Sequence, residues 1–126
     1  DIDNFRNIVD IYGNDAGDLI LRYFSKILKE YIGVGDSIAR YGNDRFIVSF
    51  PEKNLSESFQ VIEKFQDKVK HTKFVYKKER VIVTFSAGIA DRVAFENFNE
   101  LLDKANQLVL QAKEQGKNQI CSLPRE

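Results

Sequence analysis

The sequence predicts an α+β fold with a mostly antiparallel central sheet flanked by helices. Apolar residues recur at helical spacing in some stretches and alternate in others. The alternating stretches lie in neighbouring pairs joined by short polar turns, so hairpins rather than crossovers connect the middle strands. With 126 residues, 43% of them hydrophobic, the chain can bury one sizeable core. We therefore expect residues 1–126 to form a single domain.

Two helices are expected close to the N-terminus, after a first strand that ends in the opening residues. The apolar positions of the first helix are Phe5, Ile8, Val9 and Tyr12, and Gly13-Asn14 suits a left-handed exit from it. The second helix is predicted from Asp15 to Ile32, with Gly33 as its C-cap. Its apolar stripe consists of Ile20, Phe24, Ile27, Leu28 and Tyr31.

A hairpin and a third helix follow. Residues 37–41 and 46–50 are rich in β-branched and aromatic residues, and the turn Gly42-Asn43-Asp44 between them has the composition of a tight hairpin. Pro51 ends the second of these strands. Asn54 or Ser56 is expected to cap the next helix, whose apolar face is Phe59, Ile62, Phe65 and Val69.

The C-terminal half is predicted to add a second strand pair, a last helix and a closing strand. Residues 73–78 and 81–90 form the pair, and the second strand alternates Val81, Val83, Phe85, Ala87, Ile89 with Ile82, Thr84, Ser86. Asn97 or Asn99 opens the last helix and Gly116 closes it. Its inward stripe is Leu101, Ala105, Leu108, Val109 and Ala112. With residues 120–123 as the closing strand, the predicted order is β-α-α-β-β-α-β-β-α-β.

The composition excludes several classes of function. Lys and Arg total 19, as do Asp and Glu, so the net charge is zero and nucleic acid is not an expected partner. Cys121 is the only cysteine and His71 the only histidine, which excludes an internal disulfide, a zinc cluster and a histidine-based triad. No apolar run reaches membrane-spanning length, so we expect a cytoplasmic domain without direct membrane contact. The chain opens on Asp1 and has no Met, so we expect a piece of a longer protein, which could be a membrane-bound sensor.

Two motifs resemble those of the GGDEF domain family, whose members make the second messenger cyclic di-GMP from two GTP molecules. The family's hairpin motif is G-G-[DE]-E-F, and residues 42–46 read Gly-Asn-Asp-Arg-Phe. Its first strand ends in D-x-D-x-F-K, and residues 1–6 read Asp-Ile-Asp-Asn-Phe-Arg. The resemblance extends from residue 1 to residue 118. It implies the palm-like fold of nucleotide cyclases, with the first strand beside the central hairpin, in a chain that lacks the preceding helix and most of that strand.

The resemblance implies a metal site made by Asp1, the backbone carbonyl of Ile2 and Asp44. These residues occupy the family's Mg²⁺-ligand positions, with Mn²⁺ as the alternative ion, and oxygen ligands suit metal-assisted phosphoryl transfer. The ion is expected only together with a bound nucleotide. From the residues alone, a turn-forming role for Asp44 and a frayed terminus at Asp1 remain the alternative.

Arg45 departs furthest from the family, which has a second carboxylate, a Glu, at this position beside the metals. The catalytic positions implied by the resemblance are Asp44 and Arg45. A guanidinium there opposes metal binding by roughly 1 to 4 kcal/mol in a partly solvated site, although it can pair with phosphate oxygens. Asn43, after Gly42, replaces the family's second Gly. Asn tolerates a positive φ, but its side chain hinders close approach of the backbone to a triphosphate.

The nucleotide contacts implied by the resemblance are partly kept. Val9 stands where the family has an Asn that reads guanine, so one contact worth roughly 0.5 to 1.5 kcal/mol is lost, while Asp18, the other guanine-reading position, remains. Arg6, Lys113 and Lys117 keep positive charge at the phosphate-contacting positions. Favourable interaction with helix dipoles is the alternative explanation for Asp18, Lys113 and Lys117.

The family's R-x-x-D product-inhibition site falls on Gly33 and Asp36 in this chain. Bidentate capture of a cyclic dinucleotide phosphate requires the Arg, which is absent. We therefore expect no feedback binding at these positions.

These observations favour a degenerate GGDEF domain of a bacterial cyclic di-GMP signalling protein, catalytically impaired and retained for regulation, nucleotide binding or dimerisation. The alternatives are an active diguanylate cyclase that tolerates the changes and a structural adaptor without a ligand. Arg45 and Val9 affect metal and base recognition independently, which argues against activity. The retained cationic positions argue against the adaptor. By resemblance, the full-length protein would act as a homodimer in which each protomer presents one GTP to the other.

Overall fold

A computed structural model describes residues 1–125 of the chain. Its helices are α1 (Phe5–Tyr12), α2 (Asn14–Lys29), α3 (Leu55–Lys70) and α4 (Phe98–Glu114), with a 3₁₀ helix, η1, at Arg92–Ala94. Its strands are β1 (Ser37–Tyr41), β2 (Arg45–Ser49), β3 (Phe74–Tyr76), β4 (Glu79–Val81), β5 (Ala87–Ile89) and β6 (Ile120–Ser122). The predicted α+β class is confirmed. No helix in the described part of the chain is long and apolar enough to cross a membrane.

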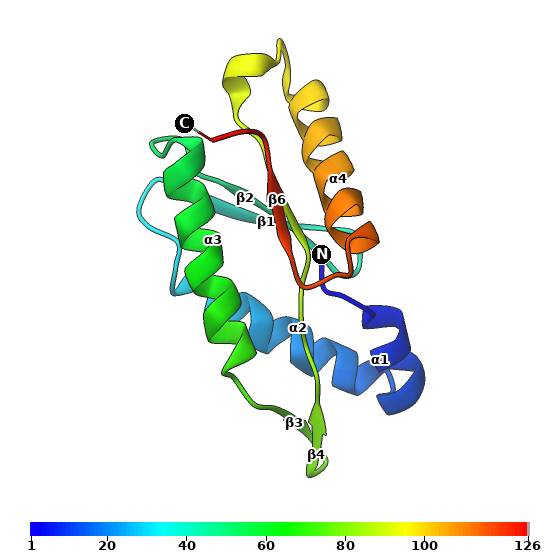
Figure 1. Ribbon diagram of the computed structural model, residues 1–126. Helices are drawn as coiled ribbons and strands as arrows, with labels where there is room; N and C mark the ends of the chain where they lie inside the picture. Colours follow the sequence, from blue (N-terminus) through cyan, green and yellow to red (C-terminus); the bar gives the residue numbers. More distant parts are fainter. Residues whose placement is uncertain (126) are drawn as a thin grey trace.

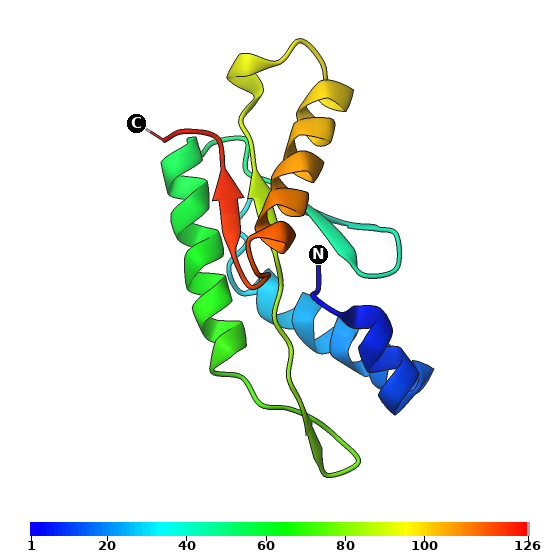
Figure 2. The same cartoon turned by 45° about the vertical axis from the view of Figure 1, so that its right-hand side comes forward.

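The strands pair in twos. β1 pairs with β2, and β3 with β4, in antiparallel hairpins. β5 and β6 run parallel, an arrangement that differs from the mostly antiparallel sheet expected from the sequence. In Figure 1, α3 and α4 flank the β5–β6 pair, and the β3–β4 hairpin projects at the lower end of the molecule. Figure 2 shows the same projection after a 45° turn. The β3–β4 hairpin is therefore separated from the layer that α3 and α4 cover.

The first strand is reduced to one bridge, between Ile2 and Phe85. The backbone nitrogen and carbonyl of Asp1 each form a 2.9 Å hydrogen bond with the backbone of Ser86. Ile2 is 1% exposed and belongs to the main hydrophobic core. The opening residues are therefore held in the middle of the fold, against the segment between β4 and β5.

The prediction of one continuous strand over residues 81–90 is wrong. Pairing with β3 stops at Val81, because residues 84–86 bond to the opening residues instead, and only from Ala87 onward does the chain pair with β6. β3 is likewise shorter than predicted. The predicted alternation is confirmed from residue 81 to residue 85, since Val81, Val83 and Phe85 are buried and Ile82 is 70% exposed, but it is wrong at Ser86, which is fully buried.

The second helix ends earlier than predicted, at Lys29. The amides of residues 30–32 bond to carbonyls three residues back, so the helix finishes in a tightened 3₁₀-type turn. The prediction of Gly33 as the C-cap is wrong, because the left-handed conformation occurs at Gly35 (φ 93°) instead. A difference of this size is typical of helix ends that finish in such a turn.

Two of the predicted helix caps are confirmed. The Asn54 side chain accepts a 2.8 Å hydrogen bond from the Glu57 amide, and the Glu57 carboxylate accepts one of 3.0 Å from the Asn54 amide, which makes a capping box. The Asn97 side chain accepts from the Glu100 amide at 3.0 Å. These local side-chain contacts set where α3 and α4 begin.

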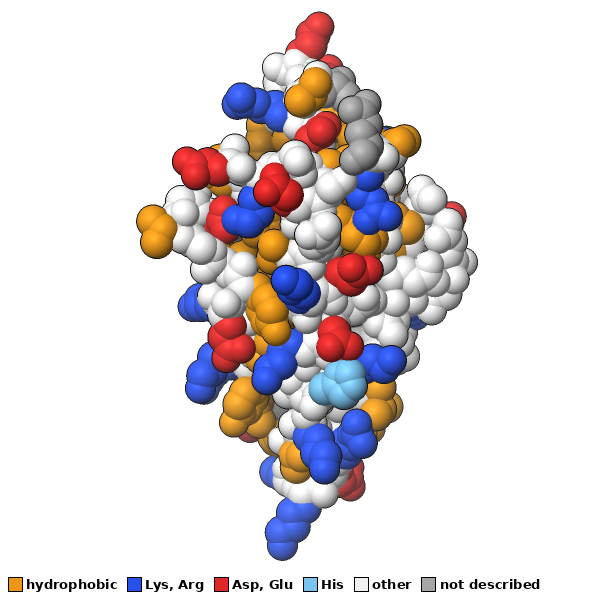
Figure 3. Space-filling model, turned by 60° about the vertical axis from the view of Figure 1, so that its left-hand side comes forward, with side chains coloured by type: hydrophobic (Ala, Val, Ile, Leu, Met, Phe, Trp, Pro, Cys, Tyr) orange, Lys and Arg blue, Asp and Glu red, His pale blue; other side chains and the backbone are white. Residues whose placement is uncertain are grey.

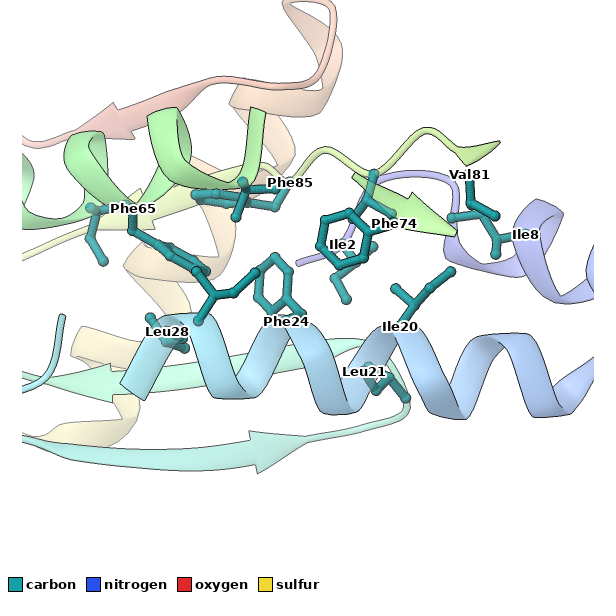
Figure 4. Close-up of a cluster of buried hydrophobic side chains, with 14 residues drawn as sticks. Ile2, Ile8, Ile20, Leu21, Phe24, Leu28, Phe65, Phe74, Val81 and Phe85 are labelled. Atoms are coloured by element: carbon teal, nitrogen blue, oxygen red, sulfur yellow. The ribbon is translucent and has the colours of Figure 1, made fainter. Parts of the chain in front are cut away.

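The core lies between α2, α3 and the segment that contains Phe85 (Figure 4). Phe65 stacks on Phe85 with ring centroids 5.0 Å apart, and Phe24 meets both rings edge-on. Ile2 joins this cluster. Its burial anchors the two aspartates that flank it in sequence, which places them at the candidate functional site.

Candidate functional site

The central hairpin turn lies beside the opening residues, as predicted. The Ile2 amide donates a 3.0 Å hydrogen bond to the Asp44 carbonyl. Gly42 supplies the left-handed conformation of the turn, with φ 71°. Asn43 has no positive φ, and its carbonyl accepts a 2.8 Å hydrogen bond from Arg40. The turn therefore brings its acidic and basic residues next to the Asp-x-Asp segment.

The charges of the site meet at Asp1, whose side chain is 12% exposed. Its Oδ2 lies 3.8 Å from Arg45 Nε and 3.6 Å from Lys113 Nζ. Its Oδ1 is buried and has no hydrogen-bond partner among the described residues. The half-exposed Arg45 guanidinium also lies over the Tyr41 ring, 5.8 Å from its centroid. One oxygen of Asp1 thus faces two cations and the other is unpaired.

Asp3 organises the site and is 2% exposed. Its carboxylate accepts hydrogen bonds from four groups: Thr84 Oγ1 (2.8 Å), Ser86 Oγ (2.7 Å), the Asn118 amide (2.9 Å) and Lys113 Nζ (3.2 Å). Burial alone would raise the pKa of Asp3, but these hydrogen bonds together hold its pKa below the usual value. Sequence reasoning assigned no role to Asp3, although residues i and i+2 of an extended segment point to the same side.

Two of the three predicted phosphate-contacting cations lie at this site. Lys113, in the last turn of α4, is bound to the Asp-x-Asp carboxylates described above. Lys117 follows the helix in a left-handed conformation, with φ 66°, and its Nζ donates to the Asn4 side chain. Arg6 is exposed on α1 and makes no hydrogen bond or ion pair with any residue that the structure describes.

The predicted base-reading positions lie where α1 meets α2. Val9 is half-buried and packs against Gly17, where an added Cβ would stand 2.8 Å from Val9 Cγ2. Asp18 is exposed and lines an open hollow of about 480 Å³ together with Arg22 and Arg40. Val9 is thus engaged in an apolar contact. Of the two predicted base-reading residues, only Asp18 offers a polar group.

The donor set fits a divalent ion poorly. Within residues 1–125, no group of three or more His, Cys, Asp or Glu side chains is placed to hold a metal. The unpaired, buried Oδ1 of Asp1 is a feature that suits a metal ligand. Its other oxygen is already neutralised by Arg45 and Lys113. The roles of Asp1, Ile2 and Asp44 as metal ligands therefore stay predictions.

The predicted loss of feedback binding concerns Gly33 and Asp36. The Asp36 side chain is 4% exposed, and its Oδ2 accepts hydrogen bonds from the Gly33 amide (2.9 Å) and from Lys53 Nζ (3.3 Å). Lys53 also lies over the Phe50 ring, 5.4 Å from its centroid. This carboxylate is therefore engaged within the fold, where it ties the start of β1 to the end of β2.

Comparison with known sequences identifies relatives. The family model "Diguanylate cyclase, GGDEF domain" matches residues 1–119. The chain is 31% identical over 121 residues to diguanylate cyclase A of Treponema denticola, and 32% identical over 123 residues to the response regulator PleD of Caulobacter vibrioides. Each match covers 95% of this chain, but only 33% and 27% of those two proteins. The chain therefore spans a third or less of their length.

Solved structures share the fold. The GGDEF domain of DgcB from Caulobacter crescentus, in complex with c-di-GMP, superposes with a TM-score of 0.92 at 25% identity, over 97% of this chain and 73% of that chain. An EAL/GGDEF domain protein from M. capsulatus superposes with a TM-score of 0.86 at 31% identity, over 99% of this chain and 81% of that chain. Because the family model covers nearly all of the sequence and these structures reproduce its fold, the chain belongs to the GGDEF domain family of diguanylate cyclases.

Proposed function

We propose that this chain is a degenerate GGDEF domain that serves cyclic di-GMP signalling as a regulatory, nucleotide-binding or dimerisation module rather than as an efficient cyclase. The observation that carries the proposal is the 3.8 Å ion pair between Arg45 and Asp1. The position of the family's second carboxylate is filled by a cation that faces the predicted metal ligand. Lys113, 3.6 Å from the same oxygen, adds a second positive charge.

A divalent ion held by Asp1 and Asp44 would lie close to both of these cations. At about 4 Å, two unit charges repel by about 1 kcal/mol in water and about 4 kcal/mol near a protein surface. Arg45 in place of Glu also removes a potential oxygen ligand. Mg²⁺ or Mn²⁺ would therefore enter together with a nucleotide, whose phosphates supply further oxygen ligands.

Nucleotide binding in this proposal is led by the phosphates. Arg6 is exposed, and Lys117 has to release only the Asn4 side chain to reach a phosphate. Both can donate charge-assisted hydrogen bonds to phosphate oxygens. On the base side, Val9 can neither donate nor accept. Binding should therefore discriminate weakly between bases.

The decisive experiment incubates the full-length protein with GTP and Mg²⁺ or Mn²⁺ and measures cyclic di-GMP by chromatography. We expect little or no product. Arg45→Glu should restore metal binding in part, and Val9→Asn should be needed as well for efficient use of GTP. Arg80→Glu, the same charge change on β4, is the matched control and should leave metal and GTP binding unchanged. Unaltered metal and GTP binding in the double variant would contradict the proposal.

An active diguanylate cyclase is the second candidate function. The observation that favours it is Asp1 Oδ1, which is buried without a partner in the described residues, as an oxygen that binds a cation would be. GTP turnover by the unmodified full-length protein at about 1 s⁻¹ or faster, the range of ordinary enzymes, would select this function.

We also propose that the full-length protein is a cytoplasmic homodimer. The family's product contains two guanosine units, and a dimer can present one GTP from each protomer. A solved relative, DgcB, is in complex with c-di-GMP. Sedimentation velocity of the full-length protein tests this proposal, and a monomer at every concentration would contradict it.

A further inference from the structure

The β3–β4 hairpin concentrates positive charge in a chain whose net charge is zero. Residues 73–82, called here the basic hairpin, include Lys73, Lys77, Lys78 and Arg80 but a single acid, Glu79. The hairpin projects from the lower end of the molecule in Figure 1, and Figure 3, turned about the vertical axis, shows Lys and Arg side chains gathered at that end. Although the net charge of the chain is zero, positive charge is concentrated at this end of the molecule.

The outer face of the basic hairpin alternates cations with exposed aliphatic side chains. The strand register pairs Val75 with Arg80, and Lys73 and Ile82 lie just beyond the paired residues at the base of the hairpin. Val75 is 51% exposed and Ile82 is 70% exposed. A single exposed aliphatic residue needs no explanation, but here Val75 is paired with Arg80 across the ladder and Ile82 lies two residues from Arg80 along the chain. The face is therefore both positively charged and apolar.

The turn of the basic hairpin adopts a conformation that lysine disfavours. Lys77 and Lys78 have φ values of 48° and 68°, both in the left-handed region. Two-residue turns of this kind favour Asn-Gly, because a Cβ atom in the left-handed region costs free energy. The geometry of the turn alone therefore does not explain why lysine occupies both positions.

We propose that the basic hairpin docks onto a membrane surface that contains anionic phospholipids. Its ammonium groups would contact the anionic head groups, while Val75 and Ile82 enter the interfacial layer. Because the hairpin projects, as Figure 2 also shows, a flat bilayer can reach it without displacing the rest of the domain. This surface shares no residue with the candidate nucleotide site. The sequence predicts no membrane contact because it has no apolar run long enough to span a bilayer. That criterion does not detect a surface that combines cations with exposed aliphatic side chains.

A nucleic acid matches the basic hairpin less well than a bilayer does. A phosphodiester backbone offers no partner for Val75 and Ile82. Lysines, which supply most of the charge, are flexible point charges without the rigid fork by which Arg recognises a planar partner. Tyr76, the aromatic residue nearest the turn, is covered by Lys77 Nζ, 5.5 Å from its ring centroid, rather than free to stack on a base.

The test is co-sedimentation of the full chain with vesicles of phosphatidylcholine alone and of phosphatidylcholine mixed with phosphatidylserine, at physiological salt. We expect binding only to the mixed vesicles. Lys77→Asn with Lys78→Gly should weaken it about thirtyfold while the melting temperature stays equal or rises, because the turn is relieved. Lys29→Gln with Lys64→Gln removes the same charge from α2 and α3, and should change binding by less than about threefold.

A second variant separates a bilayer from other polyanions. Val75→Ser with Ile82→Ser should weaken binding to the mixed vesicles about tenfold and leave retention of single-stranded RNA unchanged. Absence of binding by the parent chain would overturn the proposal, as would undiminished binding after the two lysine replacements. If RNA displaces the parent from the vesicles and the aliphatic variant binds them as well as the parent, the hairpin is a general polyanion site and the membrane proposal is overturned.

Discussion

At the scale of single residues, Asp3 determines the arrangement of the candidate site. It binds Lys113 from the end of α4, Asn118 from the loop that follows, and Ser86 from the segment before β5. A buried carboxylate requires such partners, because an unpaired charge in the interior is strongly unfavourable. The Asp-x-Asp spacing predicted where Asp3 would lie, but its partners come from other elements and have no local sequence signal.

Asp3→Asn should lower the free energy of unfolding by about 3 kcal/mol near neutral pH, because Lys113 Nζ loses its closest carboxylate. The pKa of Asp3 is lowered in the fold, so its charge stabilises the protein above about pH 4, and this stabilisation is lost as the pH falls through the folded pKa. The difference between parent and variant should therefore shrink in acid. Urea unfolding at neutral and acidic pH measures it, and a pH-independent difference would contradict this role.

Val9 is the residue that should set base selectivity. The parent is expected to bind GTP less than a hundredfold more tightly than ATP, a gap of about 2.7 kcal/mol, because Val9 offers the base no hydrogen bond. Val9→Asn should widen the preference by roughly 0.5 to 1.5 kcal/mol. Arg6→Ala, a phosphate-side control, should weaken both nucleotides alike. Calorimetric titrations test this, and a parent preference above a hundredfold would refute phosphate-led binding.

At the scale of elements, the local signals for where helices begin predicted the structure better than the patterns that predicted the extent of the strands. The starts of α3 and α4 were predictable because Asn54 and Asn97 cap them through contacts a few residues away. The predicted strand over residues 81–90 failed because its middle bonds to the opening residues, which lie far away in sequence. A strand can pair with any of several segments that are distant in sequence. The alternation of apolar and polar residues does not identify which of these segments it pairs with.

The contact between β5 and α4 should tolerate no side chain at Gly88. An added Cβ would stand 2.2 Å from the Ala105 carbonyl oxygen and 2.8 Å from Leu108 Cβ, so strand and helix would have to separate. Gly88→Ala should cost about 1 to 3 kcal/mol or more. Gly33→Ala, whose new methyl would meet only Asp36 Oδ2 at 3.4 Å, is the control and should change stability by less than about 1 kcal/mol. Similar urea midpoints for the two variants would disprove this close packing.

At the scale of the whole molecule, the distribution of charge matters more than its sum. The formal net charge is zero, yet cations surround Asp1 at the candidate site and gather again on the basic hairpin. The two surfaces share no residue. The net charge calculated from the composition reveals neither of these two concentrations of positive charge.

Metal binding should register in the stability of the whole domain. Because Arg45 and Lys113 oppose a divalent ion, Mg²⁺ should leave the melting temperature of the parent nearly unchanged. Arg45→Glu should gain stability with Mg²⁺, by about 2.7 kcal/mol when the ion is at a hundredfold its Kd. Arg45→Gln, which removes the charge without adding a ligand, should gain less. Thermal melts measure the shifts, and an equal gain by the parent would show that Arg45 does not oppose the ion.

The sequence by itself determined the α+β class, the family and the place of the candidate site. Apolar periodicity, helix caps and the two motifs are local patterns, and each can be identified without knowing what packs against it. Only the tertiary structure decided that Arg45 and Lys113 meet at Asp1, and that Asp3 is buried. Lys113 and Asp3 lie 110 positions apart in the chain and 3.2 Å apart in space. Contacts between residues so distant in sequence depend on how the whole chain packs, and local sequence patterns do not specify that packing.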